Sequence, residues 1–95
     1  MTRCMDIAMT AFKLRIITPI GEFFSGNIES IKLKNTTGYF EILANHMELI
    51  TTAIAHEAAI RINGEAKKVE LLDSVVEVSK EQVTILTNKA QWVGI

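Results

Sequence analysis

The pair Asn63-Gly64 lies between two segments in which apolar and polar residues alternate, in the stretch AAIRINGEAKKVEL. Asparagine and glycine both tolerate a positive φ, which a two-residue type I′ turn requires at its two central positions. Alternation with a period of two turns one face of each flanking segment toward a core and the other toward solvent. The sequence therefore predicts a β-hairpin with its turn at residues 63–64.

Alternation with the same period recurs from residue 12 onward. The segments FKLRI, EFFSG, SIKLK and YFEIL are typical of strands, whereas TPIG and NTTG carry the proline, asparagine and glycine residues of turns. We expect the second strand to stop at Gly26. Ile28 is out of phase with Ile31 and Leu33, which indicates a bulge or twist near Glu29.

The segment from Ala44 to Glu57 is ambiguous, because its residues would also suit an amphipathic helix. The β-branched run Ile50-Thr51-Thr52 disfavours a helix, and the neighbouring segments are strand-like, so we expect a loop and a short strand. Farther along, VVEVSKEQVTILT predicts a second hairpin with a polar turn at 79–82. The residues expected to face one another across it are Val76, Val78, Val83 and Ile85.

Together these segments predict an all-β fold, a flattened β-sandwich or barrel of about ten short strands. The length of 95 residues and the hydrophobic content of 48% suit one domain with a single core. We place this single β-sandwich domain at residues 9–91, with residues 1–8 as a disordered extension and residues 92–95 as a tail.

Charge and targeting signals limit the partners. Ten basic and eleven acidic residues give a net charge of −1 without a basic cluster, so we expect no nucleic acid partner. Neither a signal peptide nor an apolar run of membrane-spanning length is present, so we expect membrane contact only through a partner. Cys4 is the single cysteine and cannot form an internal disulfide, which favours a reducing compartment.

Motifs for catalysis or ligand binding are missing from the sequence. His46 and His56 are separated by ten positions and accompany no CxxC or HExxH motif, so they do not predict a metal site. GxSxG, GxGxxG and the P-loop are also missing. We therefore expect no catalytic, cofactor-binding or metal-binding residues and no small-molecule substrate. The chain is predicted not to be an enzyme. The remaining class is a domain that binds other proteins.

Short motifs occur along the chain in a fixed order and spacing. They are Thr18-Pro19-x-Gly21, Phe24-Ser25-Gly26, Glu29-Ser30, Gly38, Ile42-Leu43 and His46-x-x-Leu49-Ile50-Thr51. From about Phe12 to Ala90 the chain thereby resembles the N-terminal β-sandwich domain of the epsilon subunit of F-type ATP synthase, called delta in mitochondria. Members of that family usually continue into a C-terminal helical hairpin, of which these 95 residues contain no counterpart.

Two stretches depart from the family pattern. Gly-Ile-Leu-Pro-Gly-His in the family corresponds to Glu41-Ile-Leu-Ala-Asn-His46 in this chain, and Gly-Gly before the VEV strand corresponds to Asp73-Ser74. The chain thus resembles a divergent member, in which the loop before Leu49 has lost two glycines and a proline.

The resemblance implies a non-catalytic central-stalk, or rotor, subunit. Such a subunit links the gamma subunit to the membrane c-ring and supports the coupling of proton flow to ATP synthesis. It would be peripheral, on the cytoplasmic face of a bacterial cell membrane. The alternative from the same fold is a free-standing β-sandwich adaptor that binds another protein by strand addition or loop contact. A small hydrolase is a third class, which no motif supports.

The resemblance also implies partner-binding residues at the gamma and c-ring interface: Thr18, Gly38, Tyr39, Glu41, His46 and Thr51. For His46 the alternatives are an interface contact, a hydrogen bond within its loop, and a catalyst or ligand. Thr18 and Thr51 are equally explained as ordinary strand threonines. Tyr39 occupies the position of an acidic family residue that contacts the c-ring, and Glu41, two residues on along the same strand face, would supply the missing charge.

Overall fold

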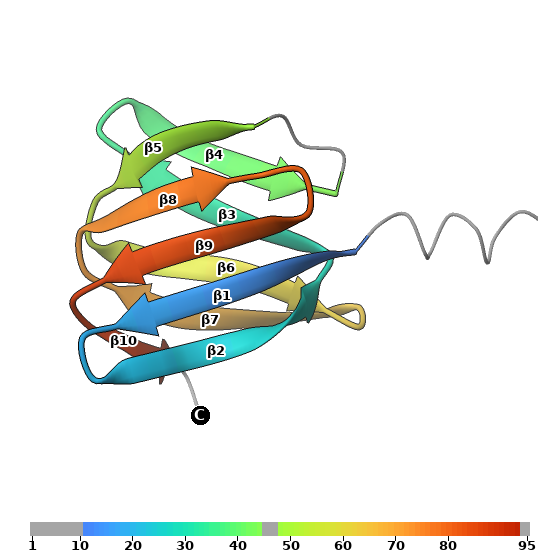
Figure 1. Ribbon diagram of the computed structural model, residues 1–95, viewed down its shortest axis with the longest axis horizontal. Coiled ribbons are helices and arrows are strands. Elements are labelled where there is room, and N and C mark those ends of the chain that lie inside the picture. Colours follow the sequence, from blue (N-terminus) through green and yellow to red (C-terminus); the bar gives the residue numbers. More distant parts are fainter. Residues whose placement is uncertain (1–10, 45–47, 94–95) are drawn as a thin grey trace, which may run out of the picture.

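The computed structural model describes residues 11–44 and 48–93, and the described chain is all-β (Figure 1). Ten strands follow one another as β1 (Phe12–Thr18), β2 (Gly21–Ile28), β3 (Ser30–Asn35), β4 (Gly38–Leu43), β5 (Leu49–Ala53), β6 (His56–Ile62), β7 (Glu65–Leu71), β8 (Ser74–Val78), β9 (Gln82–Thr87) and β10 (Ala90–Val93). The predicted all-β sandwich of about ten short strands is confirmed. The predicted extension at residues 1–8 lies outside the described residues.

The strands form two five-stranded sheets that pack face to face. Sheet A has the order β2-β1-β9-β8-β5, and sheet B has the order β10-β7-β6-β3-β4. All pairs are antiparallel except β1 with β9, which is parallel. In Figure 1 the edge strands β4 and β5 lie on one side of the sandwich, and β2 and β10 lie on the other.

The core lies between the sheets and is almost entirely aliphatic. Alternate residues of each strand point inward, and many of these side chains are fully buried, among them Leu14, Ile31, Ile60, Val76 and Ile85. Each such side chain contributes about 1.5–3 kcal/mol to stability relative to an exposed position. The period-two pattern in the sequence therefore corresponds to burial on the inner face of each sheet.

The hairpin between β6 and β7 has the predicted turn. Asn63 has a φ of 52° and Gly64 a φ of 81°, as a type I′ turn requires, and Ile62 pairs with Glu65 across the two residues. The hairpin between β8 and β9 is also confirmed, because Val76 pairs with Ile85 and Val78 with Val83. The expectation of a short strand after the loop near residue 45 is met by β5.

Two details near Gly26 differ from the sequence-based expectation. The second strand continues through Gly26, which pairs with Leu14, and ends at Ile28. At Glu29 the chain leaves sheet A and enters sheet B, so the phase change is a switch between sheets. A register shift does occur, but it lies between Ile16 and Ile17 in the β1–β2 pair.

The last strand also differs from the expected tail. Trp92 pairs with Val69, and Val93 pairs with Lys68, so these residues belong to β10. The Trp92 ring lies near two rings of β2, with its centroid 5.4 Å from that of Phe23 and 5.8 Å from that of Phe24. This aromatic cluster joins the edge strands of the two sheets, which is why the sandwich includes residues that resembled a tail.

Candidate docking surfaces

The outer face of sheet A carries an apolar row that crosses three strands. Ile17 of β1 pairs with Leu86 of β9, and Leu86 pairs with Val75 of β8. Val75 is 43% exposed and Leu86 is 48% exposed. On β5 the partner of Val75 is Thr52, whereas Ile50, which is 72% exposed, lies opposite Glu77. A contiguous apolar patch on a folded domain marks a surface that another molecule covers.

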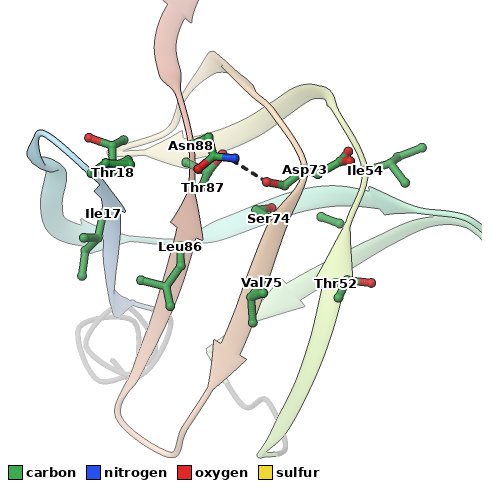
Figure 2. Close-up of a pocket in the computed structure, with 12 residues that line it drawn as sticks. Ile17, Thr18, Thr52, Ile54, Asp73, Ser74, Val75, Leu86, Thr87 and Asn88 are labelled. Carbon is green, nitrogen blue, oxygen red and sulfur yellow. Dashed lines mark hydrogen bonds between the residues drawn. The ribbon is translucent and has the colours of Figure 1, made fainter.

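A shallow depression of about 710 Å³ lies where this row meets the ends of the strands (Figure 2). Ile17, Val75 and Leu86 form its apolar floor, and Thr18 and Thr52 contribute polar groups to its rim. No described pair or triad of acids, histidines or cysteines surrounds it. Its apolar floor is suited to receive an apolar side chain of a partner.

The outer face of sheet B is polar by contrast. Its central row consists of Glu41, Lys32, Ala59 and Lys68, which follow one another across β4, β3, β6 and β7. Charged side chains here keep their hydration, and alanine contributes little apolar area. The outer face of sheet A differs from it by the apolar row, next to which Arg15, Thr84 and Glu77 form a polar row.

The turn of the β3–β4 hairpin lies at the end of the sandwich where β1, β5 and β9 end (Figure 1), and residues at those strand ends line the depression. Asn35 Oδ1 accepts hydrogen bonds from Thr37 N at 2.9 Å and from Thr37 Oγ1 at 2.7 Å. Gly38 follows with a φ of 134°, a value that residues other than glycine rarely adopt. Tyr39 is then presented to solvent with 64% of its surface exposed.

Two lysines of β3 surround the Tyr39 ring. The Nζ atom of Lys32 lies 5.6 Å from the ring centroid, and that of Lys34 lies 5.1 Å from it. Both distances are within the range of a cation–π contact, which contributes about 0.5–1 kcal/mol at an exposed site. Tyr39 and Glu41 are both exposed on β4 and share one face, as predicted.

His56 forms a hydrogen bond with the backbone of Lys34, on the side of β3 that faces β6. The Lys34 N–H donates to His56 Nε2 at 3.1 Å, so Nε2 must be unprotonated. The proton is then on Nδ1, which lies 2.6 Å from the carbonyl oxygen of Ile54 and donates to it. The Ile54 N–H donates in turn to the Lys34 carbonyl at 2.9 Å. A neutral imidazole therefore ties β3 to the β5–β6 turn, whose Ile54 also lines the depression.

Replacing His56 with phenylalanine is expected to lower the free energy of unfolding by about 2 kcal/mol. The ring keeps a similar shape, but it leaves the Lys34 N–H and the Ile54 carbonyl without their partner, at about 1–3 kcal/mol for each unsatisfied buried group. Urea denaturation measures the change. The exposed neighbour Glu57 supplies the control, since E57Q is expected to change stability by less than about 0.5 kcal/mol. Equal stability of the two variants would show that the imidazole is not structural.

The structure divides the predicted partner-binding residues into separate groups. Gly38, Tyr39 and Glu41 lie together on β4, whereas Thr18 lies at the depression, where its Oγ1 donates to the Gly21 carbonyl at 2.9 Å. Thr51 is half-buried on β5, and the following residue, Thr52, lines the depression in its place. The prediction for His46 lies outside the described residues.

The apolar row was missed by sequence reasoning, although a signal for it exists. Each strand of the row contains an apolar doublet, namely Ile16-Ile17, Val75-Val76 and Ile85-Leu86. Adjacent residues of a strand point to opposite faces, so a doublet makes both faces apolar. Three doublets on neighbouring strands predict a sheet that is covered on both sides.

Within residues 11–44 and 48–93 no three histidine, cysteine, aspartate or glutamate side chains are grouped to hold a metal ion. The same residues include no helix with the length and apolar character needed to cross a membrane. The exposed apolar row on the outer face of sheet A is typical of a surface that docks on another protein.

Comparison with known proteins identifies the family of this β-sandwich. The sequence model described as "ATP synthase, Delta/Epsilon chain, beta-sandwich domain" matches residues 11–93. The chain belongs to this family.

Curated relatives carry the name of one subunit. The ATP synthase epsilon chain of Ruminococcus albus is 36% identical over 85 residues, which are 88% of this chain and 63% of the relative. The ATP synthase epsilon chain of Clostridium novyi is 42% identical over 82 residues, which are 85% of this chain and 63% of the relative. The chain thus spans slightly less than two thirds of the length of these two relatives.

Solved structures share the fold at low sequence identity. A chain in the mitochondrial ATP synthase of Euglena gracilis, determined with OSCP, F1 and the c-ring, superposes with a TM-score of 0.81 at 14% identity, covering 87% of this chain and 54% of that one. A chain in the central stalk and c-ring of the Tetrahymena thermophila mitochondrial ATP synthase gives a TM-score of 0.70 at 16% identity, covering 83% and 64%. These values establish a common β-sandwich.

Proposed function

We propose that this chain is a non-catalytic central-stalk subunit of an F-type ATP synthase. It links a gamma-type subunit to the membrane c-ring and so supports the coupling of proton flow to ATP synthesis. It acts as a peripheral protein at the cytoplasmic face of a bacterial cell membrane and reaches the membrane only through the c-ring. It needs no cofactor, because its work is to hold two protein surfaces together.

The apolar row on the outer face of sheet A is the observation that carries this proposal. A rotor subunit needs a stiff body with a surface that stays covered, and the row of Ile17, Leu86 and Val75 with its depression meets that need. We assign this face to the gamma-type partner, with Thr18 at the rim of the contact. We assign the β3–β4 hairpin, with Gly38 and Tyr39, to the c-ring. Membership of the family supports the stalk function, and the two structures of similar fold belong to ATP synthase assemblies that contain a c-ring.

A second candidate function rests on β5. This edge strand, LITTA, contains no charged residue, and its Ile50 is 72% exposed. Edge strands without charges, prolines or bulges are open to pairing with another extended segment. A free-standing adaptor that binds its partner by strand addition at β5 would use this property.

A pull-down from native membranes separates the two functions. The tagged chain is mixed with detergent-solubilised membranes of the source cell, and the retained proteins are identified by mass spectrometry. Recovery of both a gamma-type subunit and c subunits is expected. Recovery of neither would exclude the stalk function, and an unrelated protein whose binding protects the β5 amides from exchange would establish the adaptor. The isolated chain is expected to show no ATPase activity.

A further inference from the structure

The ammonium groups of Lys32 and Lys34 converge on one exposed aromatic ring without meeting an acid. Their Nζ atoms lie 5.6 and 5.1 Å from the Tyr39 ring centroid. The ion pair found in the described residues joins Arg15 and Glu22 at 2.6 Å, in the other sheet. The phenol ring attracts the ammonium groups but carries no net charge, so both positive charges remain available to a partner.

Nearby acids balance the charge of this surface. Glu41 is the cross-strand neighbour of Lys32, and Glu57 lies on the same outer face, two residues from Ala59, the other neighbour of Lys32, so two lysines stand beside two acids and the four groups sum to zero. We call the side chains of Lys32, Tyr39 and Lys34 the Lys-Tyr-Lys patch. At position 39, where the resemblance leads one to expect an acid, the chain thus has an aromatic ring with two ammonium groups over it.

The backbone beneath the patch is held before any partner arrives. The Lys34 N–H and carbonyl are both bonded to the β5–β6 turn, through His56 and Ile54. Asn35 fixes the turn that follows through two hydrogen bonds to Thr37. A site that is ordered in advance loses little conformational entropy on binding, which is what a docking contact requires.

We propose that the Lys-Tyr-Lys patch recognises a carboxylate on the protein loop that meets the β3–β4 end of the sandwich. This inference rests on the proposed function, under which that loop belongs to the c-ring. The two ammonium groups attract the anion, and the exposed Tyr39 ring packs on the apolar part of its side chain. Glu41 limits the charge of the patch and does not itself contact a basic group of the ring.

A protein carboxylate fits these observations better than an anionic lipid headgroup. Segments that bind anionic membranes typically carry clusters of about 4–8 lysines or arginines, whereas this patch has two lysines. The whole chain has a net charge of −1, so no long-range attraction to an anionic surface adds to it. Two cations on one ring provide a site for a single acidic side chain.

Charge reversal in the patch tests the proposal. Delipidated c-ring in detergent is captured on the immobilised chain, and the affinity is compared for the unmodified chain, the double variant K32E/K34E and the control K68E. Lys68 lies in the same row of the same outer face as Lys32, two strands away. The double variant is expected to lose at least about tenfold in affinity, because like charges then face each other. The control is expected to change by less than about twofold.

Additional variants separate recognition from an effect on folding. Tyr39→Phe keeps the ring and is expected to retain binding, whereas Tyr39→Ala removes the aromatic surface and is expected to weaken it. Glu41→Gln is expected to leave affinity unchanged or to raise it, and a tenfold loss in this variant would move the contact to Glu41 and overturn the proposal. Unchanged capture of the gamma-type subunit by each variant shows that the sandwich is intact.

The remaining outcomes distinguish failure of the proposed stalk function from failure of the Lys-Tyr-Lys patch alone. An unmodified chain that binds neither the gamma-type subunit nor the ring refutes the proposed function and the patch together. Ring capture that is equal in the unmodified chain and in K32E/K34E refutes the patch alone. Flotation with phosphatidylglycerol vesicles is expected to show no binding, and vesicle binding that K32E/K34E abolishes while ring capture persists would assign the patch to lipid and overturn the proposal.

Discussion

Replacing Ile85 with alanine is expected to lower the free energy of unfolding by about 3 kcal/mol, whereas replacing the adjacent Leu86 is expected to cost less than about 1 kcal/mol. Ile85 is fully buried on the inner face of β9, where its register partners are Val76 and Ile16. Leu86 lies on the outer face with 48% of its surface exposed. One step along the strand thus separates a core position from a surface position.

The difference follows from cavity formation. Removing three carbons from a side chain enclosed by both sheets leaves a void that neighbouring side chains fill only in part, and buried Ile→Ala substitutions cost about 2–5 kcal/mol. The exposed part of Leu86 is already hydrated, so its removal loses little transfer free energy.

Urea denaturation of the two variants beside the parent chain measures this contrast. At the size of this domain, a loss of about 3 kcal/mol lowers the thermal midpoint by about 12–24 °C. The slope of unfolding free energy against urea should stay the same, because the surface exposed on unfolding changes little. Comparable losses in the Ile85 and Leu86 variants would contradict the assignment of inner and outer faces.

The fold was predictable from the sequence because its signals are local. A two-residue turn at Asn63-Gly64 requires positive φ at both positions, and both residues tolerate it. Strict alternation along β1, β8 and β9 states which residues are inside. The switch between sheets at Glu29 was not predictable in the same way, since a bulge and a change of sheet produce the same phase shift along the chain.

The candidate surfaces depend on contacts between distant segments, which a single strand pattern does not report. Lys34 and His56 are separated by 22 positions, and nothing in the sequence near either residue indicates that the ring accepts this N–H. The pairing of Tyr39 with Lys34 follows from the short β3–β4 turn, so the approach of the two lysines could have been predicted. The family pattern indicates only that an acid is missing at position 39.

The apolar doublets contribute both to the core and to the docking surface. Ile16-Ile17, Val75-Val76 and Ile85-Leu86 each place one residue in the core and one on the outer face of sheet A. Their outer members become neighbours only after β1 and β8 pair with the two edges of β9. Local alternation therefore establishes the core, and the order of the strands establishes the docking surface.

Replacing Leu86 with glutamate is expected to weaken binding of the gamma-type subunit by more than about 100-fold, the largest effect that a single surface substitution should have. Leu86 is the middle residue of the apolar row and pairs with Ile17 on one side and Val75 on the other. A partner that covers the row would bury the new carboxylate without a counter-charge, which costs several kcal/mol, and about 1.4 kcal/mol corresponds to a tenfold change in affinity.

Gln82 supplies the matched control for this experiment. It lies on the same strand and the same outer face as Leu86, at the opposite end of β9. The substitution Q82E therefore adds the same charge outside the apolar row. Titration calorimetry with the purified gamma-type subunit should show near-parental affinity for Q82E and loss of binding for L86E. Urea denaturation should show parental stability for both, because each side chain is at least partly exposed. Parental affinity of a folded L86E chain would mean that the outer face of sheet A is not where this partner docks, and the contact would have to be sought on another face of the sandwich.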